Sequence, residues 1–199
     1  MTMLKTFGSY FSCFNEAFPL INSIGGYYEA NELQALWEAV QGLEKCDLIL
    51  EVGVERGRSA AAICLAAQAA GHDPVLYAID AFCDHPNEYI KGSFLETMQG
   101  IEQLFRLAVR RSSEVDLSDW PESFDFVHID GGHEYETVLG DALRFGRRVR
   151  KGGRMAFHDY ERESLPDVAR AVREWWKREG TAWRRMTTEG TTTIVEKVS

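Results

Sequence analysis

Residues 48–59 read Leu-Ile-Leu-Glu-Val-Gly-Val-Glu-Arg-Gly-Arg-Ser, an apolar run that leads into two glycines and a serine. The run Leu48–Val52 predicts a buried strand, and Ser59–Ala70 predicts a helix that stops at Gly71. The glycines would let the chain turn tightly and let a ligand approach the backbone. The same pattern could be a strand-to-helix turn without a ligand. Glu51 argues against that simpler interpretation, because a carboxylate in a buried strand needs a partner.

Apolar runs and helical stretches alternate along the rest of the chain. Further strands are expected at Val75–Ile79, Leu107–Arg110, Phe124–Ile129 and Arg154–Phe157, and helices at Asn31–Leu43, Asn87–Phe105 (interrupted near Gly92 and Gly100), Tyr135–Val149 (closed by Lys151-Gly152-Gly153) and Pro166–Glu179. Residues 182–187 and 191–198 flank Glu189-Gly190 and predict an antiparallel hairpin, whereas residues 1–30 show no period. Strands separated by helices form parallel sheets. The predicted fold is α/β: a Rossmann-like doubly wound sheet of five parallel strands plus the C-terminal hairpin, with helices on both faces.

Composition and charge disfavour several classes of protein. The 199 residues are 45% hydrophobic and 27% charged, with a formal net charge of −9. A chain with this charge and only short basic groups is not expected to bind nucleic acid. The N-terminus has neither a signal-peptide run nor a membrane span, so we expect a cytoplasmic protein without a membrane partner. Cys13, Cys46, Cys64 and Cys83 lack zinc-like spacing and are expected to be free thiols.

Ligands of parallel sheets bind outside the carboxyl ends of the strands, so the residues at those ends are the candidates for function. Asp80 ends the second strand, where an acid can hold the hydroxyls of a ribose, and Phe82 could lie against a base. The simpler interpretation of Asp80 is an exposed loop acid. The glycine loop is not a GxGxxG phosphate site, because Glu55 stands where the middle glycine would be. An acidic loop suits a cationic or zwitterionic ligand better.

The fourth and fifth strands end in residues that can hold metals and protons. Asp130 ends the fourth strand, His133 follows one turn later, and the fifth strand ends in His158-Asp159. If these strands are neighbours, Asp130, His158 and Asp159 would converge and could bind a divalent metal. Neutral His133 could take a proton from a group bound there. A lone histidine usually has no such role, but two His and two Asp at one edge favour a site.

Five blocks in order resemble a class I S-adenosylmethionine-dependent methyltransferase. They are EVGVERGRS, the acid of AID, RSSE, FDFVHIDGGHEYETV and KGGRMAFHDY, and the resemblance covers about residues 29–199. The chain is most similar to the small bacterial macrocin-type sugar O-methyltransferases, and the catechol O-methyltransferases share the plan. We therefore divide it into a segment of residues 1–46, covering the cofactor and acceptor site, and a methyltransferase domain of residues 47–199.

The resemblance also implies roles for individual residues. The cofactor-binding positions would be Glu51, Gly53, Gly57 and Ser59 for the methionine portion, Asp80 for the ribose, Phe82 and Ser113 for the adenine, and Asp130 beside them. Asp130, His158 and Asp159 match the metal ligands, and His133 matches the general base. His158 departs from the family, which usually has a carboxylate there. Imidazole is a poor Mg²⁺ ligand, so the metal would be weakly bound Mg²⁺, would be Mn²⁺ or another borderline ion, or would be absent.

The reaction implied is methyl transfer from S-adenosylmethionine to a hydroxyl of a small molecule, a sugar or a diol such as a catechol. The alternatives are a non-catalytic S-adenosylmethionine- or nucleotide-binding domain, a metal-independent methyltransferase, and a hydroxylase-like relative. Loops at residues 1–30, 82–95 and 160–165 would recognise the acceptor, and the N-terminus could also pack on a second subunit of a homo-oligomer. Their aromatic residues could line an acceptor pocket or only cover the core: Tyr10, Phe11, Phe14, Phe18, Tyr27, Tyr28, Tyr89 and Tyr160.

Overall fold

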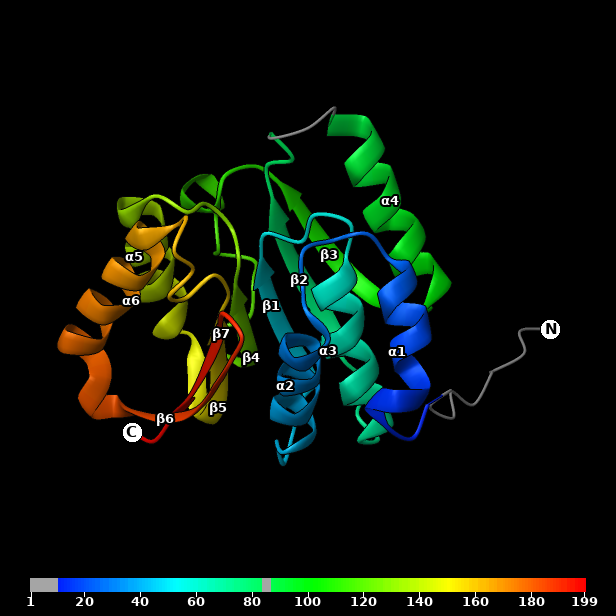
Figure 1. Ribbon diagram of the computed structural model, residues 1–199, viewed down its shortest axis with the longest axis horizontal. Helices are drawn as coiled ribbons and strands as arrows, with labels where there is room; N and C mark the ends of the chain where they lie inside the picture. Colours follow the sequence, from blue (N-terminus) through cyan, green and yellow to red (C-terminus); the bar gives the residue numbers. More distant parts are fainter. Residues whose placement is uncertain (1–10, 84–86) are drawn as a thin grey trace.

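The computed structural model describes residues 11–83 and 87–199, which form a seven-stranded sheet between two layers of helices (Figure 1). Tyr10 and residues 84–86 of the predicted acceptor loop lie outside the described residues. The helices are α1 Phe14–Ser23, α2 Ala30–Gln41, α3 Arg58–Ala69, α4 Asn87–Gly100, α5 Tyr135–Gly146 and α6 Pro166–Glu179. The strands are β1 Leu48–Val52, β2 Val75–Asp80, β3 Leu104–Val109, β4 Phe124–Ile129, β5 Val149–Phe157, β6 Trp183–Glu189 and β7 Thr192–Lys197. Short 3₁₀ turns lie at Ser112–Glu114 and Gly180–Ala182.

The strand order is β3-β2-β1-β4-β5-β7-β6, and the first five strands in this order are parallel. The order reverses between β1 and β4, which opens a crevice at their carboxyl ends where ligands of such sheets bind. The predicted fold class is confirmed. One detail differs from the simple picture of two added antiparallel strands. β7 pairs antiparallel with both β5 and β6, so β6 runs in the same direction as the first five strands.

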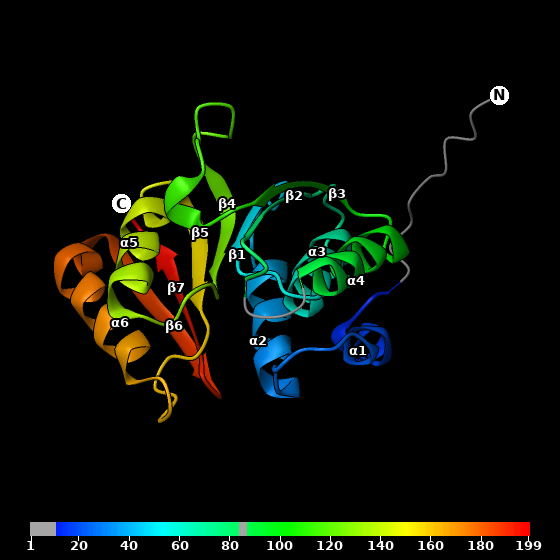
Figure 2. The same cartoon turned by 90° about the horizontal axis from the view of Figure 1, so that it is seen from above.

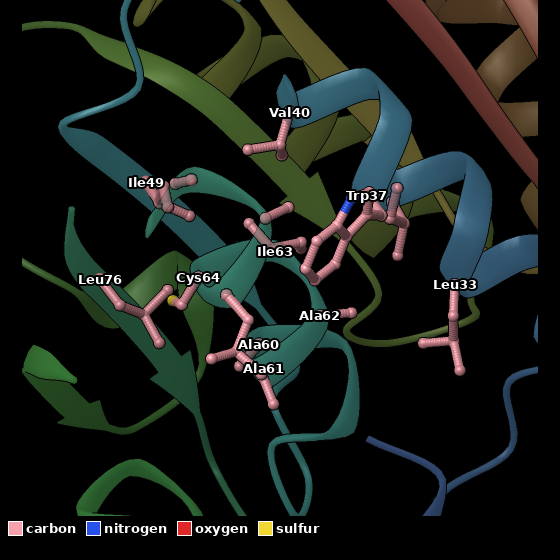
Figure 3. Close-up of a cluster of buried hydrophobic side chains, with 14 of the residues drawn as sticks. Leu33, Trp37, Val40, Ile49, Ala60, Ala61, Ala62, Ile63, Cys64 and Leu76 are labelled. Carbon is pink, nitrogen blue, oxygen red and sulfur yellow. The ribbon is translucent and has the colours of Figure 1, made fainter. Parts of the chain in front are cut away.

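Alternate residues of each central strand enter opposite cores, as the pleat of a strand requires. Ile49 and Phe126 face the core beneath α1–α4, whereas Leu50 and Val127 face the core beneath α5 and α6. Figure 2 shows these two helical layers on either side of the twisted sheet. Figure 3 shows Trp37 of α2 pointing towards α3 in the first core. In the described part of the chain, the central strands are thus covered on both faces, which leaves their ends for a ligand.

Three local predictions were wrong. The first is the aperiodic N-terminus: α1 forms there and buries Phe14, Ala17 and Ile21 on one face, although Pro19 lies inside it. The second is the helix expected over Asn87–Phe105 with a break at Gly92: α4 runs through Gly92 without interruption and ends at Gly100, and β3 begins at Leu104 rather than Leu107. A helical glycine costs only about 1 kcal/mol relative to alanine, and the packing of α4 exceeds that.

The third concerns the junction between α5 and β5. The helix ends at Gly146 rather than Val149, and the glycine pair Gly152-Gly153 lies inside β5 rather than before it. The register with β4 shifts there, and Gly152 has a φ of +75°. The glycines therefore form a β-bulge within the strand. A bulge and a turn can both require a positive φ, so the sequence did not distinguish them.

The cysteines are free as expected, with Cys46 and Cys64 buried. No helix among the described residues is long and apolar enough to cross a membrane.

Candidate active site

A cavity of about 1020 Å³ lies at the carboxyl ends of β1, β2, β4 and β5. This is at the upper end of the range of about 300–1,000 Å³ that is usual for small-molecule pockets. Most residues singled out from the sequence line it: Gly53, Ser59, Asp80, Phe82, Ser113, Asp130, His133, His158 and Asp159. The wall also includes Gly26, Tyr27 and Tyr28 from the segment between α1 and α2. Residues from five separate parts of the chain thus meet at the edge that the topology opens.

Gly53 is fixed by a close backbone approach. Its φ is +83°, and a Cβ placed on it would lie 2.0 Å from the carbonyl oxygen of Asp130. No side chain fits there, so the loop after β1 and the loop after β4 touch directly, backbone to backbone.

Two predicted cofactor residues, Glu51 and Gly57, do not line the cavity. Gly57 is the N-cap of α3 with a φ of +87°, and a Cβ on it would meet Phe94 and Thr97 of α4 at 3.2 Å. The absence of a side chain at Gly57 therefore allows α3 and α4 to pack closely. Glu51 is fully buried beneath the glycine loop, where its Oε1 accepts a hydrogen bond of 2.6 Å from Ser59 Oγ.

Asp80 organises the cofactor side of the cavity. Its Oδ2 accepts hydrogen bonds of 2.9 Å from the backbone N–H groups of Val54 and Glu55, and its Oδ1 accepts one of 2.6 Å from Phe82. Phe82 itself has a φ of +48° and is buried in the wall. A carboxylate has about four acceptor positions, so three backbone bonds leave capacity for a ligand hydroxyl.

On the other side of the cavity, Asp130, His133 and Asp159 come together. Each offers one ligand atom, and the three atoms lie within 4.8 Å of one another. His133 Nε2 lies 3.1 Å from Asp159 Oδ2, while Arg162 donates a hydrogen bond of 2.8 Å to Asp159 Oδ1. The hydrogen bond to Asp159 raises the pKa of His133 above its ordinary value. Burial alone would raise the pKa of Asp159, but the bonds from His133 and Arg162 hold it at about 2.

The predicted ligand His158 lies against the same two carboxylates, with its Nδ1 3.6 Å from Asp159 Oδ2, although it is not one of the three residues grouped above. The His158 ring is stacked on Tyr28 with centroids 3.9 Å apart, and its Nδ1 lies 3.0 Å from Asp130 Oδ1. Its Nε2 faces Glu32 Oε2 at 3.6 Å. Burial alone would lower the pKa of His158, but the surrounding carboxylates raise it to about 10. The carboxylates of Asp130, Glu32 and Asp159 thus surround the His158 ring.

Glu32 is a residue near the site that the sequence did not single out. It lies buried in the first turn of α2, and its Oε1 accepts hydrogen bonds from the backbone N–H of Thr191 at 2.6 Å and from its hydroxyl at 2.7 Å. Its Oε2 accepts a 2.8 Å bond from the backbone N–H of Glu29. Burial alone would raise the pKa of Glu32, but His158 and these donors lower it to about 2. Glu32 therefore joins α2, the β6–β7 turn and the site.

Tyr28 and His128 were also missed as a pair. The Tyr28 hydroxyl lies 3.1 Å from His128 Nε2 and donates a 2.7 Å hydrogen bond to Asp130 Oδ2. Burial and the nearby Asp130 raise the pKa of Tyr28 well above its ordinary value, so the hydroxyl keeps its proton. A signal existed: His128 precedes Asp130 by two residues, which places both side chains on the same face of the strand.

Comparisons with known proteins bear on the family and the fold of the chain. Residues 50–160 match a family described as a methyltransferase domain, and no curated protein matches the chain by sequence. The solved O-methyltransferase NovP is similar in structure, with a TM-score of 0.68 at 16% identity over 85% of this chain and 81% of NovP. TomG, an O-methyltransferase of tomaymycin synthesis from Streptomyces achromogenes solved with S-adenosylmethionine, gives 0.65 at 15% over 87% and 82%. CalS11, a TDP-rhamnose 3'-O-methyltransferase, gives 0.62 at 18% over 90% and 79%.

At these identities the structural likeness concerns the fold. The family match is a separate finding: it spans more than half of the chain and includes the glycine loop and the strand ends from Glu51 to Asp159. The chain therefore belongs to the methyltransferase-domain family, as a class I S-adenosylmethionine-dependent methyltransferase.

Proposed function

We propose that this enzyme methylates a hydroxyl oxygen of a small molecule, with His133 as the general base. The observation that carries the proposal is the His133–Asp159 pair beside Asp130, at the end of the cavity opposite Phe82 and Asp80. When one nitrogen of an imidazole is hydrogen-bonded to a carboxylate, the other nitrogen can accept a proton from a substrate.

The hydrogen bond to Asp159 assigns the two ring nitrogens of His133 different tasks. In the neutral ring, Nε2–H donates to Asp159 Oδ2, which leaves the lone pair of Nδ1 for the acceptor hydroxyl. As the acceptor oxygen forms its bond to the methyl carbon, the carbon–sulfur bond breaks and the hydroxyl proton passes to Nδ1. Asp159 then stabilises the imidazolium that results. The remaining acceleration comes from alignment of oxygen, methyl and sulfur.

The methyl donor would lie along the loop after β1. Gly53 and Ser59 would border its methionine portion, Asp80 would bind the ribose hydroxyls, and Phe82 and Ser113 would border the adenine. The support is that all five line one cavity and that Asp80 has spare acceptor capacity. Glu51 and Gly57 would act indirectly, since neither of them lines the cavity.

The residues near Asp130 also fit the divalent cation that the resemblance implies. The donor set is two carboxylates and an imidazole within 4.8 Å, and carboxylate oxygens are the ligands that Mg²⁺ and Mn²⁺ prefer. We assign the cation to Asp130 and Asp159, which leaves the His133 imidazole for the proton. When bound, such a cation lowers the pKa of a hydroxyl that it holds. His158, which faces Asp130 and Glu32, would balance charge beneath them rather than bind the metal.

A sugar hydroxyl, or one hydroxyl of a diol or catechol, is the acceptor that this site would suit. NovP, TomG and CalS11 are O-methyltransferases, and CalS11 acts on TDP-rhamnose, which supports an oxygen acceptor by analogy. The acceptor side of the wall includes Gly26, Tyr27 and Tyr28, which belong to the proposed covering segment of residues 1–46.

The test is transfer of a labelled methyl group from S-adenosylmethionine to a panel of sugar nucleotides, free sugars and catechols. His133→Ala should lose about 10²–10⁴-fold in turnover while retaining cofactor affinity by calorimetry. His72→Ala is the matched control, because His72 follows the C-terminal end of α3 and does not line the cavity. Turnover of His133→Ala within about threefold of the wild type would refute the base assignment, since this is under 1 kcal/mol of barrier.

A further inference from the structure

A buried chain of polar side chains runs beneath the site from α3 to Asp130. Ser59 Oγ donates to Glu51 Oε1 at 2.6 Å, and the same oxygen lies 2.8 Å from His128 Nδ1. His128 Nε2 lies 3.1 Å from the Tyr28 hydroxyl, which donates to Asp130 Oδ2 at 2.7 Å. Glu51 and His128 are fully buried, and Tyr28 is 8% exposed. Polar groups are rarely placed so deep between apolar core residues unless each one has a partner.

The number of protons available fixes which atom donates and which accepts in most of these hydrogen bonds. Asp130 as a carboxylate only accepts, so the single hydroxyl proton of Tyr28 is committed to it. The Tyr28 oxygen must then accept from His128 Nε2–H. A hydrogen bond also joins Glu51 Oε1 to His128 Nδ1, and its proton lies on one of these two atoms. The hydrogen bonds thus point towards Asp130 from beneath, which fixes the orientation of its carboxylate.

Tyr28 reaches this position from outside the strands that carry the other site residues. It belongs to the segment between α1 and α2, and Arg58 at the start of α3 holds that segment in place. Arg58 Nη1 donates to the carbonyl of Gly26 at 3.1 Å and Nη2 donates to Asn22 Oδ1 at 2.5 Å. The residue that meets Asp130 is therefore anchored on the helix that follows the cofactor loop.

We propose that Tyr28, supported by His128 and Glu51, is a positioning residue for methyl transfer: its hydroxyl holds the Asp130 carboxylate in the orientation that the acceptor requires. The proposal rests on the proposed function, because Asp130 is there assigned to the divalent cation beside the general base. The competing explanation is that Tyr28 only covers the core. The two differ in the hydroxyl group, since the ring alone supplies the packing on His158.

The experiment compares the wild type with Tyr28→Phe, which keeps the ring and removes the hydroxyl. We expect kcat to fall about 10- to 100-fold, as for loss of a hydrogen bond to a charged group, with cofactor Kd within about threefold. Tyr77→Phe is the matched control, because Tyr77 is a half-buried tyrosine that packs on Trp120 and Phe124 outside the cavity. A kcat of Tyr28→Phe within about threefold of the wild type, whatever its melting temperature, would overturn the proposal.

A readout without an acceptor separates this proposal from the proposed function. The His128 ring N–H that faces Tyr28 should exchange slowly and give a resolved signal in a proton–nitrogen correlation spectrum, assigned by its loss in His128→Asn. Tyr28→Phe should shift or abolish this signal, and Tyr77→Phe should leave it in place. If the wild type methylates no hydroxyl acceptor, the proposed function fails. The spectrum then tests by itself whether the hydrogen-bonded chain from Glu51 to Asp130 exists. A wild-type spectrum without the signal, or the same signal in Tyr28→Phe, would overturn it.

Discussion

Replacing Glu32 by Gln should destabilise the protein in a pH-dependent way. Glu32 accepts four hydrogen bonds or ion contacts from Thr191, Glu29 and His158, and these lower its pKa from 4.5 to about 2. A carboxyl whose folded pKa is depressed contributes stability above its unfolded pKa and loses it as pH falls through the folded pKa. At about 1.4 kcal/mol per pKa unit, this contribution is about 3 kcal/mol at pH 7 and about 1 kcal/mol at pH 3.

Urea unfolding followed by circular dichroism at pH 7 and pH 3 measures both values. Glu32→Gln should lower the free energy of unfolding by about 3 kcal/mol at pH 7, and the difference from the wild type should shrink by about 2 kcal/mol at pH 3. The control is Glu38→Gln on the exposed face of the same helix, which should change stability by about 0.5 kcal/mol or less. Equal losses for Glu32→Gln at both pH values would refute the reasoning, because the effect would then not depend on the charge.

Three other predictions concern the site and its frame. Asp80→Ala should weaken S-adenosylmethionine binding about tenfold or more by calorimetry, since a charge-assisted contact to the ribose is lost, and an unchanged affinity would contradict the assignment. In protein freed of divalent metal, His133 should titrate by NMR with a midpoint above 6.5, because the hydrogen bond to Asp159 raises its pKa, and the methyl-transfer rate should rise with pH because only the neutral ring accepts a proton; a midpoint below that value would count against the His133–Asp159 pair. Gly53→Ala should lower the melting temperature sharply, since its Cβ would lie 2.0 Å from a carbonyl oxygen, whereas Gly92→Ala, facing open space, should stabilise by up to about 1 kcal/mol.

The parts of the fold that could be predicted are those whose signals are local. The bounds of β1, β4 and α6 follow from an apolar run or from a proline start, and the structure confirms them. The N-terminal helix was missed because Pro19 removes a helical hydrogen bond, a cost that burial of Phe14 and Ile21 against α3 and its neighbours outweighs. Tertiary packing of this kind is not visible in a ten-residue window.

The candidate site also has a part that could be predicted from the sequence and a part that could not. That Asp80, Asp130 and Asp159 would meet at one edge follows from strand ends in a parallel sheet, and needs no side-chain detail. The orientation of His158 could not be predicted, because it depends on Glu32, which is distant in sequence and resembles an ordinary acid in the first turn of a helix. That Glu51 needed buried partners was predictable, but their identity was not: they are Ser59 in the first turn of α3 and His128 on the neighbouring strand.

The contact between Gly53 and the Asp130 carbonyl has a consequence for how ligands affect one another. Two loops that meet through side chains can move independently, because a rotamer change absorbs the displacement. Here backbone meets backbone, so a shift of one loop must be passed to the other. If the donor moves the first loop on binding, acceptor affinity changes, and thermodynamic reciprocity requires the acceptor to change donor affinity by the same factor. The two binding constants of this enzyme are then a linked pair, and a substitution that strengthens one through this contact also alters the other.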